Sequence, residues 1–322
     1  MSRLNCVVAR WKVPPVIEKG FYYEFENRHR GSRSEIRGRL EIYNQTIELL
    51  ELELLPRNAI DYGCGRGEWL RLLSERSWQV LGVDSNDDML SPAQADGLTV
   101  EVGDCLSHIA SQPDNSVTLI TGFHIVEHLP PDVLHDFVKH AHRVVRPGGL
   151  VIFETPNPEN ILVGSNRFYS DPTHVHPLPP KYLEFVVEFY GFSEATCIGI
   201  NQPNLRYQTG SAAAFLEMME LFPDYAVLGR KPKEGATSTG FLEFVRKTYP
   251  DSNPYSYRVI DDFIDKTHRN EMELADLKTH NEQNRDEIER LKAEVRFFRE
   301  KLERRGLSAM WDRLKKKIRS QR

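Results

Sequence analysis

The spacing of apolar positions changes from one segment of the chain to the next, and these changes predict a series of strands and helices. From Gly31 to Leu55, apolar side chains recur every three or four residues, which predicts a helix. Short apolar runs then alternate with helical stretches, the clearest of which are Glu68–Arg76 and Pro131–Val145. The predicted strands are Ala59–Tyr62, Gln79–Val83, Thr99–Val102, Val117–Thr121 and Leu150–Glu154. This alternation predicts an α/β fold built on a parallel, doubly wound sheet.

The next part of the chain completes this sheet and then leaves it. Lys181–Phe189 has helical spacing, and Ala195–Ile200 and Tyr225–Leu228 are two further strands that can finish the sheet as a hairpin-like pair. The following segment is rich in Lys, Gly, Pro, Ser and Asn, which is typical of a linker. The predicted divisions are an N-terminal extension and helix (1–56), an α/β domain (57–230) and a linker (231–258).

Residues 259–305 follow a heptad pattern, which predicts an α-helical coiled coil of about six heptads. Asn281 and Asn284 interrupt its apolar positions near the centre. In a parallel pair, four of the five g–e′ contacts join opposite charges, so we expect parallel self-association as a dimer or trimer. Those four pairs are Lys266–Glu271, Glu273–Lys278, Glu287–Lys292 and Glu294–Arg299. The alternative is a long solvated helix that packs on its own domain.

The C-terminal end, residues 306–322, combines an apolar helical face that includes Trp311 with a basic opposite face. Residues 304–322 hold eight basic residues and one acidic residue, a net charge of +7 that leaves −12 on the rest of the chain. A basic amphipathic helix with Trp predicts association with a membrane surface, and a nucleic-acid tail or a frayed end are the alternatives. The acidic body disfavours nucleic acid as a partner of the main domain.

The remaining composition narrows the class of protein. The four cysteines are scattered without a C-x-x-C pair, so neither a disulfide framework nor a zinc site is expected. No apolar run approaches about 18 residues, and the N-terminus lacks the pattern of a signal peptide. From these observations we expect a cytoplasmic protein.

A glycine-rich turn, Gly63-x-Gly65-x-Gly67, falls between a predicted strand and a predicted helix. Glycines let the backbone turn sharply and approach a ligand, and the following helix offers free N–H groups. Asp84 ends the next strand, where a carboxylate can accept hydrogen bonds from ribose hydroxyls. Glu68 stands where the dinucleotide fingerprint has its last glycine, so that fingerprint fails.

With Asp61 in front, the turn reads D-x-G-x-G-x-G and resembles motif I of class I S-adenosylmethionine (SAM)-dependent methyltransferases. The carboxylate of Asp61 suits a ligand with a sulfonium and an amino group and repels a pyrophosphate. Val145-Arg146-Pro147-Gly148-Gly149 is also typical of that superfamily, and the resemblance implies that Asp104 faces the adenine amine. It implies a Rossmann-like domain over residues 57–230 with SAM as cofactor. An ordinary glycine-rich βα turn is the alternative.

Four of the eleven histidines fall in two short segments that the fold predicts to lie near the acceptor, beyond the carboxyl ends of the strands. Transfer of a methyl group to oxygen needs a base, and an imidazole with a nearby carboxylate suits that task. The predicted catalytic set is His124, Glu127, His128 and His174, with His174 or His124 as the base. In the alternative interpretation, Glu127 and His128 cap the following helix.

The interpretation we favour needs no metal ion, but a metal site stays open as an alternative. His124-x-x-Glu127-His128 with a later His174 resembles the small-RNA terminal 2′-O-methyltransferases, in which E-x-x-E-H and a distant histidine surround a divalent ion. His124 replaces the first carboxylate of that pattern, and imidazoles favour softer ions than Mg²⁺.

The whole arrangement resembles the bacterial O-antigen chain-terminating methyltransferases. The segments that carry this resemblance are Phe25–Ser32, Glu154–Asn160 and Asp171–Pro177. It implies O-methylation of the non-reducing end of a lipid-linked polysaccharide at the inner face of the cell membrane, with the coiled coil as a spacer and a polysaccharide polymerase as a further partner. No kinase motifs follow residue 230, so the acceptor is a sugar hydroxyl or a phosphate installed by another protein. An acceptor that is a small molecule or an RNA end, and a non-catalytic scaffold, are the alternatives.

Overall fold

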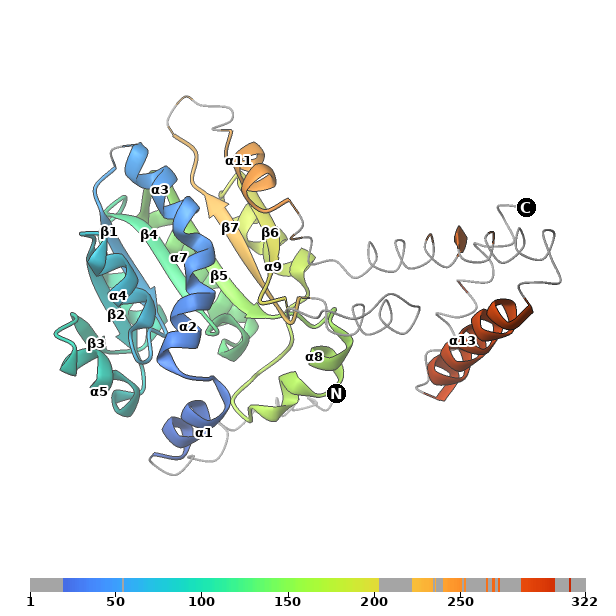
Figure 1. The fold of residues 1–322 in the computed structure, drawn as a ribbon. Coiled ribbons are helices and arrows are strands. Elements are labelled where there is room, and N and C mark those ends of the chain that lie inside the picture. Colours follow the sequence, from blue (N-terminus) through green and yellow to red (C-terminus); the bar gives the residue numbers. More distant parts are fainter. Residues whose placement is uncertain are drawn as a thin grey trace, which may run out of the picture.

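The computed structural model describes residues 20–53, 55–202, 222–233, 235, 240–250, 252, 265, 268–269, 272, 285–304 and 313. Within these residues, seven strands form one sheet in the order β3-β2-β1-β4-β5-β7-β6 (Figure 1). The strands are β1 (Asn58–Tyr62), β2 (Gln79–Asp84), β3 (Val100–Val102), β4 (Val117–Phe123), β5 (Val145–Pro156), β6 (Glu194–Ile200) and β7 (Asp224–Arg230). All seven lie where the apolar pattern predicts a strand.

The sheet is parallel except at one edge. β1 pairs in parallel with β2 and β4, β2 with β3, and β4 with β5. β7 runs antiparallel to both β5 and β6, so the predicted hairpin-like pair closes the sheet. Because strand order reverses between β1 and β4, the crevice for a ligand lies at the carboxyl ends of these two strands. This arrangement is a Rossmann-like α/β fold.

Helices cover both faces of the sheet, because neighbouring residues of each buried strand point to opposite faces. In β5, Val151 and Phe153 pack on one face while Leu150 and Ile152 pack on the other. The first face is covered by α6 (Cys105–Ser111), α7 (Pro131–Val144) and α9 (Pro180–Phe189). The second is covered by α2 (Arg33–Leu40), η1 (Glu41–Tyr43), α3 (Asn44–Leu52), α4 (Glu68–Glu75) and α11 (Phe241–Thr248).

The predicted N-terminal helix exists as α2, η1 and α3 in succession, and its apolar face is buried against the sheet. The five residues at helical spacing, Ile36, Leu40, Tyr43, Ile47 and Leu50, are all buried. The start of α2 is stabilised by a capping box, in which Ser32 and Glu35 each bond to the other's backbone N–H. These helices therefore belong to the domain rather than to an extension in front of it.

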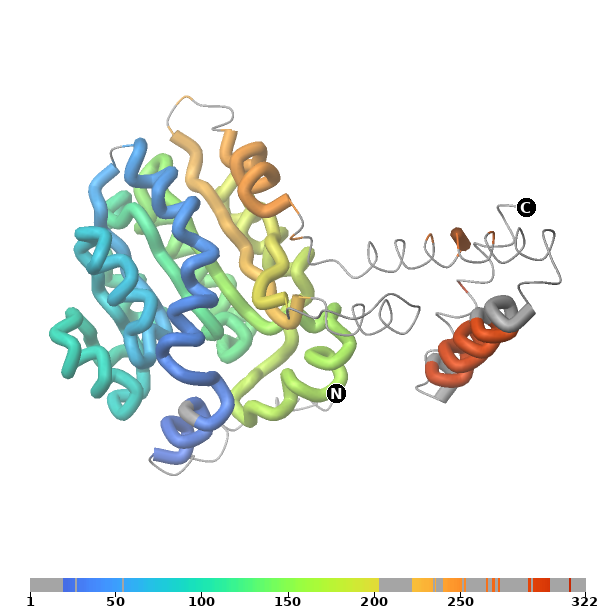
Figure 2. The backbone as a smooth tube through the Cα atoms, viewed as in Figure 1, coloured from blue at the N-terminus to red at the C-terminus, as the bar shows by residue number. Residues whose placement is uncertain are grey.

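Among the described helices, α1 (Phe21–His29), α8 (Ile161–Ser165) and α11 lie where the sequence predicted none. α1 lies at the end of the sheet that also carries α8 (Figure 1). α11 falls inside the predicted linker, yet Phe241 and Val245 are buried in the same core as α2 and α4, and the helix contacts β6 (Figure 2). The domain therefore extends at least to α11, because this short amphipathic helix covers the second face of the sheet over β6 and β7.

The remaining described helices are α5 (Asp87–Ala95), η2 (Val126–His128), η3 (Arg167–Ser170) and α13 (Arg285–Arg304). α13 is helical where the heptad pattern predicts a helix, and in Figure 1 it stands apart from the sheet. Most of the predicted coiled coil (259–305) and of the predicted amphipathic end (306–322) lies outside the described residues, so both stay predictions. Among the described helices, none is both long enough and apolar enough to cross a membrane.

Candidate active site

The glycine-rich turn joins β1 to α4 and lies against the end of β2. The N–H of Gly63 donates to the carbonyl of Val83 at 2.8 Å. The N–H of Gly65 donates to Asp84 Oδ2 at 3.0 Å, and that of Asn86 donates to Asp84 Oδ1 at 2.8 Å. The carboxylate is thereby fixed in place, and each of its oxygens keeps a lone pair with which it can accept a ribose hydroxyl.

Two of the glycines are required by their backbone conformation and by close neighbours. Gly67 has φ +79°, and a Cβ there would lie 2.8 Å from the Cβ of Ala93. Gly63 has φ +69°, and a Cβ there would lie 3.1 Å from the Cβ of Ile125. Any side chain would strain the turn and push α5 or the end of β4 away. The turn therefore depends on residues without a Cβ, as its sequence predicts.

Asp61 lies beneath this turn and is nearly inaccessible, with 3% of its surface exposed. The Thr121 hydroxyl donates to its Oδ1 at 2.7 Å. Burial raises the pKa of Asp61 to about 7, although the Thr121 bond and the charge of Arg30 act in the opposite direction. The carboxylate thus lacks enough positive charge around it, which fits a cationic ligand at this place.

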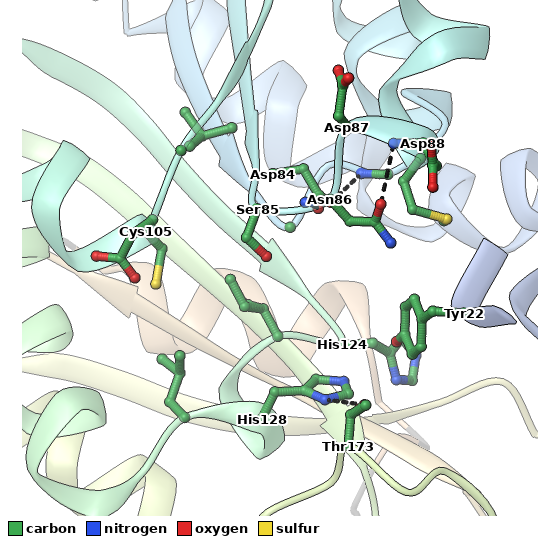
Figure 3. A pocket seen from close by; sticks show the side chains of 18 of the residues that line it. Tyr22, Asp84, Ser85, Asn86, Asp87, Asp88, Cys105, His124, His128 and Thr173 are labelled. Carbon is green, nitrogen blue, oxygen red and sulfur yellow. Dashed lines mark hydrogen bonds between the residues drawn. The ribbon is translucent and has the colours of Figure 1, made fainter. Parts of the chain in front are cut away.

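Two cavities among the described residues meet above the turn. One, of about 600 Å³, is lined by Gly63, Gly65, Asp84 and Asp104 and by residues 85–89 of the α5 start. The other, of about 480 Å³, extends toward α1, η3 and the ends of β5 and β7. The described residues that line both are Tyr22, Arg30, Gly63, His124 and His128. In Figure 3, Asp84–Asp88 lie on one side of the first cavity, and His124 and His128 lie on the opposite side.

The first cavity is lined by four of the six residues that the sequence predicted for cofactor binding: Gly63, Gly65, Asp84 and Asp104. Asp104 caps α6 by accepting the N–H of Ser107 at 2.7 Å, and its exposed side chain lines the cavity near Gly103. Of the other two, Gly67 is the N-cap of α4 and lines neither cavity. Asp61 itself lines the second cavity, next to Gly63. These residues fit SAM chemically, and the roles expected of Asp84 at the ribose, Asp104 at the adenine and Asp61 at the cationic end stay predictions.

His124 follows the last residue of β4 with φ +55°, a left-handed conformation that is uncommon outside glycine. Its Nδ1 lies 3.2 Å from Glu127 Oε1, and its Nε2 lies 3.4 Å from Glu154 Oε1. Burial alone lowers the pKa of His124, but its bonds to Glu127 and Glu154 and the charge of Asp224 raise it well above its usual range. A protonated imidazole has no lone pair, so His124 does not fit the role of base.

Glu127 lies in η2, directly after His124, and is completely buried. The Thr155 hydroxyl donates to its Oε2 at 2.9 Å, while His124 bonds to its Oε1. Burial raises the pKa of Glu127, but the hydrogen bond and charge of His124 outweigh burial and lower it to about 2. Glu127 is therefore an anion at neutral pH.

His128 and His174 come from distant parts of the chain and form an edge-to-face pair with ring centroids 4.8 Å apart. The Thr173 hydroxyl donates to Asp171 Oδ1 at 2.6 Å, so at 2.9 Å it accepts from His128 Nδ1. The carbonyl of Phe168 can only accept, so at 2.6 Å it receives the N–H of His174 Nδ1. Burial lowers the pKa of His174 and favours its neutral ring. A neutral His174 therefore keeps its lone pair on Nε2.

The predicted catalytic residues thus lie together, and the structure adds neighbours that the sequence did not single out. Tyr22 on α1 lines both cavities, and its hydroxyl donates to Asp171 Oδ2 at 3.4 Å. Glu154 lies two residues before the end of β5, accepts the hydroxyl of Tyr43 at 2.7 Å and lines the second cavity with Asp224. Glu154 opens the E-T-P-N-P-E-N run of the sequence, which was the available signal; no local pattern marks Tyr22.

Comparison with known proteins agrees with this geometry. A family model described as a methyltransferase domain matches residues 36–195. A probable SAM-dependent methyltransferase of Mycolicibacterium smegmatis is 27% identical over 144 residues, which cover 45% of this chain and 55% of that protein. A ubiquinone biosynthesis O-methyltransferase of Methylococcus capsulatus is 30% identical over 109 residues, which cover 32% of this chain and 45% of that protein. The chain spans about half the length of the curated relatives that it matches.

A solved structure gives the same result. The SAM-dependent methyltransferase of Archaeoglobus fulgidus is 27% identical with a TM-score of 0.57, and the match covers 66% of this chain and all of that one. Fold, glycine-rich turn and relatives together define a class I methyltransferase domain. The chain carries a SAM-dependent domain of this class, and SAM is its cofactor.

Proposed function

We propose that this chain is an O-methyltransferase that takes its methyl group from SAM in the first cavity and its acceptor in the second. The observation that carries this proposal is that the two cavities meet at Gly63, His124 and His128. A donor and an acceptor in adjoining cavities can be held in the geometry that a direct transfer needs. The relative from Methylococcus capsulatus, named as an O-methyltransferase, supports oxygen as the acceptor atom.

SAM supplies an electrophilic methyl group. The acceptor oxygen forms a bond to this methyl carbon while the carbon–sulfur bond breaks and leaves its electron pair on sulfur, and the acceptor hydroxyl loses its proton. Asp61 faces the positive end of the donor, and Asp84 fixes its ribose side. The cluster of Glu127, His128 and His174 offers the lone pairs that draw the proton from the acceptor hydroxyl.

The charges of the second cavity favour an uncharged hydroxyl over a phosphate as the methylated group. Its lining holds the buried carboxylates of Asp61, Glu154 and Asp171, with Asp224 beside them. The described lining also holds three arginines: Arg30 is paired with Glu26, while Arg39 and Arg167 are exposed, and the six carboxylates of the lining outnumber them. Anionic walls repel a phosphate but accept hydrogen bonds from sugar hydroxyls.

The specific acceptor that we propose is the non-reducing end of a lipid-linked polysaccharide of the O-antigen type, whose methylation terminates chain growth. The motifs at residues 25–32, 154–160 and 171–177 support it through their resemblance to chain-terminating enzymes. In this proposal the coiled coil over residues 259–305 joins two or three copies and holds the domain at a set distance from the inner face of the cell membrane, which the basic end at 306–322 contacts.

The test is transfer of labelled methyl from SAM to a panel of lipid-linked glycans, small phenols and RNA ends, followed by mass analysis of the product. We expect label on a terminal sugar hydroxyl of the glycan. Gly65→Arg should abolish SAM binding by calorimetry together with transfer, because Gly65 has φ +49° and lines the SAM cavity. Label on a phenol or RNA end only would contradict the glycan assignment, and absence of SAM binding in the wild type would contradict the enzyme.

Sedimentation of the full chain with anionic vesicles tests the membrane part. We expect the protein to pellet with vesicles and to be released at high salt, because the basic end acts through screened charges. A protein that stays in the supernatant at low salt contradicts the membrane contact.

A further inference from the structure

The three lone-pair donors at the junction of the cavities converge on one another. Glu127, His128 and His174 each present one carboxylate oxygen or ring nitrogen, and these atoms all lie within 4.8 Å of one another. His174 Nε2 is 3.9 Å from Glu127 Oε1 and 3.8 Å from Asp171 Oδ2. The bond of His174 Nδ1 to the Phe168 carbonyl leaves the Nε2 of a neutral ring without a proton.

In the neutral form of both rings, acceptor atoms therefore face acceptor atoms there. Such an arrangement is electrostatically unfavourable unless a cation stands between the lone pairs. His124 donates to the same Glu127 oxygen at 3.2 Å, but a carboxylate oxygen has lone pairs for both a hydrogen bond and a metal.

We propose that Glu127, His128 and His174 bind a divalent cation. A tetrahedral ion with ligands at about 2.1 Å separates its donor atoms by about 3.4 Å, so the present spacing needs to contract by no more than about 1.4 Å. Two imidazoles and one carboxylate suit Mn²⁺, Co²⁺ or Zn²⁺ better than Mg²⁺ or Ca²⁺, which prefer oxygen ligands.

Partners of the three ligands support this assignment independently. His128 Nδ1 is held by Thr173, which is itself held by Asp171. His174 Nδ1 is held by a backbone carbonyl, and the second oxygen of Glu127 is held by Thr155. Metal ligands in proteins are oriented by this kind of outer hydrogen bond, which turns the free lone pair toward the ion.

The cation deepens the proposed function and rests on it. Lone pairs that bind the ion cannot also take the acceptor proton, so the cation instead acidifies the acceptor hydroxyl, whose proton then passes to solvent. A divalent cation at the meeting point of the two cavities lowers the pKa of a hydroxyl group that approaches it. His128, which lines both cavities, places the ion within reach of the second one.

The test measures the metal alone on the full chain after treatment with a chelator. Mn²⁺ is titrated without SAM and followed by electron paramagnetic resonance and calorimetry, and Co²⁺ is followed by its visible absorption. We expect one Mn²⁺ per chain and an affinity at least about tenfold lower in His128→Gln, His174→Gln and Glu127→Gln. His140→Gln on α7 is the matched control, because the side chain of His140 takes part in no hydrogen bond with the described residues except one from Arg143. This variant should bind Mn²⁺ like the wild type.

A urea-unfolding midpoint close to that of the wild type shows that a variant is folded. Thr173→Val provides a second variant, because it keeps every ligand and removes only the hydroxyl that orients His128, and its Mn²⁺ affinity should fall about tenfold. Failure to bind Mn²⁺ or Co²⁺, or binding that all four variants leave unchanged, overturns the cation site. Methyl transfer that continues in excess chelator would also overturn the cation site, but it would leave the proposed methyltransferase function intact. Metal binding without any SAM binding would instead contradict the methyltransferase function and leave the cation site standing.

Discussion

Replacing Asp61 by Asn should stabilise the empty protein and weaken its hold on SAM. Asp61 is buried, and burial raises its pKa from 3.8 to about 7. A carboxyl with a raised pKa keeps its proton in the folded state over a pH range in which the unfolded chain has lost it, so the free energy of unfolding falls as pH rises from about 4 to 7. Asn is isosteric, still accepts the Thr121 hydroxyl and carries no such cost.

The size of the effect follows from the pKa difference. A pKa difference of about three units lowers the free energy of unfolding by about 4 kcal/mol above pH 7, because each pKa unit contributes about 1.4 kcal/mol. At pH 5 the loss is only about 1.6 kcal/mol, because the folded protein still keeps the proton there. The free energy of unfolding that Asp61→Asn gains over the wild type should therefore be about 2–3 kcal/mol larger at pH 8 than at pH 5. SAM should bind about ten- to a hundredfold more weakly, since a charged hydrogen bond contributes about 1.5–3 kcal/mol.

The assays are urea unfolding without ligand at pH 5 and pH 8, and calorimetry with SAM over the same range. Wild-type affinity for SAM should fall about tenfold per pH unit below pH 7, while the variant shows no such slope. Asp136→Asn, on the exposed side of α7, is the control and should change neither quantity. An equal gain in the free energy of unfolding at both pH values would refute the raised pKa of Asp61. Unchanged SAM affinity in the variant would refute the contact between Asp61 and the cationic end of SAM.

Three further substitutions test the turn, the second cavity and the domain boundary. Gly67→Ala places a Cβ 2.8 Å from that of Ala93 at φ +79°, and should lose about 1–3 kcal/mol of stability and most SAM binding, measured by urea unfolding and calorimetry. Tyr43→Phe removes the buried hydroxyl that donates to Glu154, and should cost about 1–3 kcal/mol in urea. Phe241→Ala empties a fully buried site under α11, and should cost about 3–5 kcal/mol in urea.

Each of these has an outcome that contradicts it. Normal SAM binding in Gly67→Ala would show that the turn tolerates a side chain. A stable Tyr43→Phe would show that Glu154 needs no buried partner. If Phe241→Ala were as stable as the wild type, α11 would be part of a linker and not of the domain. The matched control is Phe189→Ala, which removes an exposed ring of the same kind and should change stability by less than about 0.5 kcal/mol.

The sheet and the turn could be predicted from the sequence because their signals are local. Strands buried on both faces leave short apolar runs, and helices leave a three- and four-residue period, as in the five buried positions of α2, η1 and α3. Gly63, Gly65 and Gly67 are adjacent in the chain, and the backbone conformation that requires them is a property of the turn itself. Asp84 was predictable because it ends the strand beside β1.

Other elements escaped prediction because their signals are weak or distant. α1 has no clear apolar period, and it matters through Tyr22 and Arg30, which face cavities built by residues far along the chain. α11 lies in a segment whose composition is typical of a linker, and only burial of Phe241 shows that it belongs to the core.

The sequence by itself determined an α/β domain with a SAM turn and a group of histidines near its acceptor side. Only the tertiary structure decided what each histidine can do, because protonation depends on partners that are not neighbours in the chain. His124 is held between Glu127 and Glu154 and stays protonated. His174 donates a hydrogen bond from its Nδ1–H to a carbonyl and turns the lone pair of its Nε2 toward Glu127. One histidine is thus protonated and the other neutral, and their burial and hydrogen bonds, rather than their residue type, decide which is which.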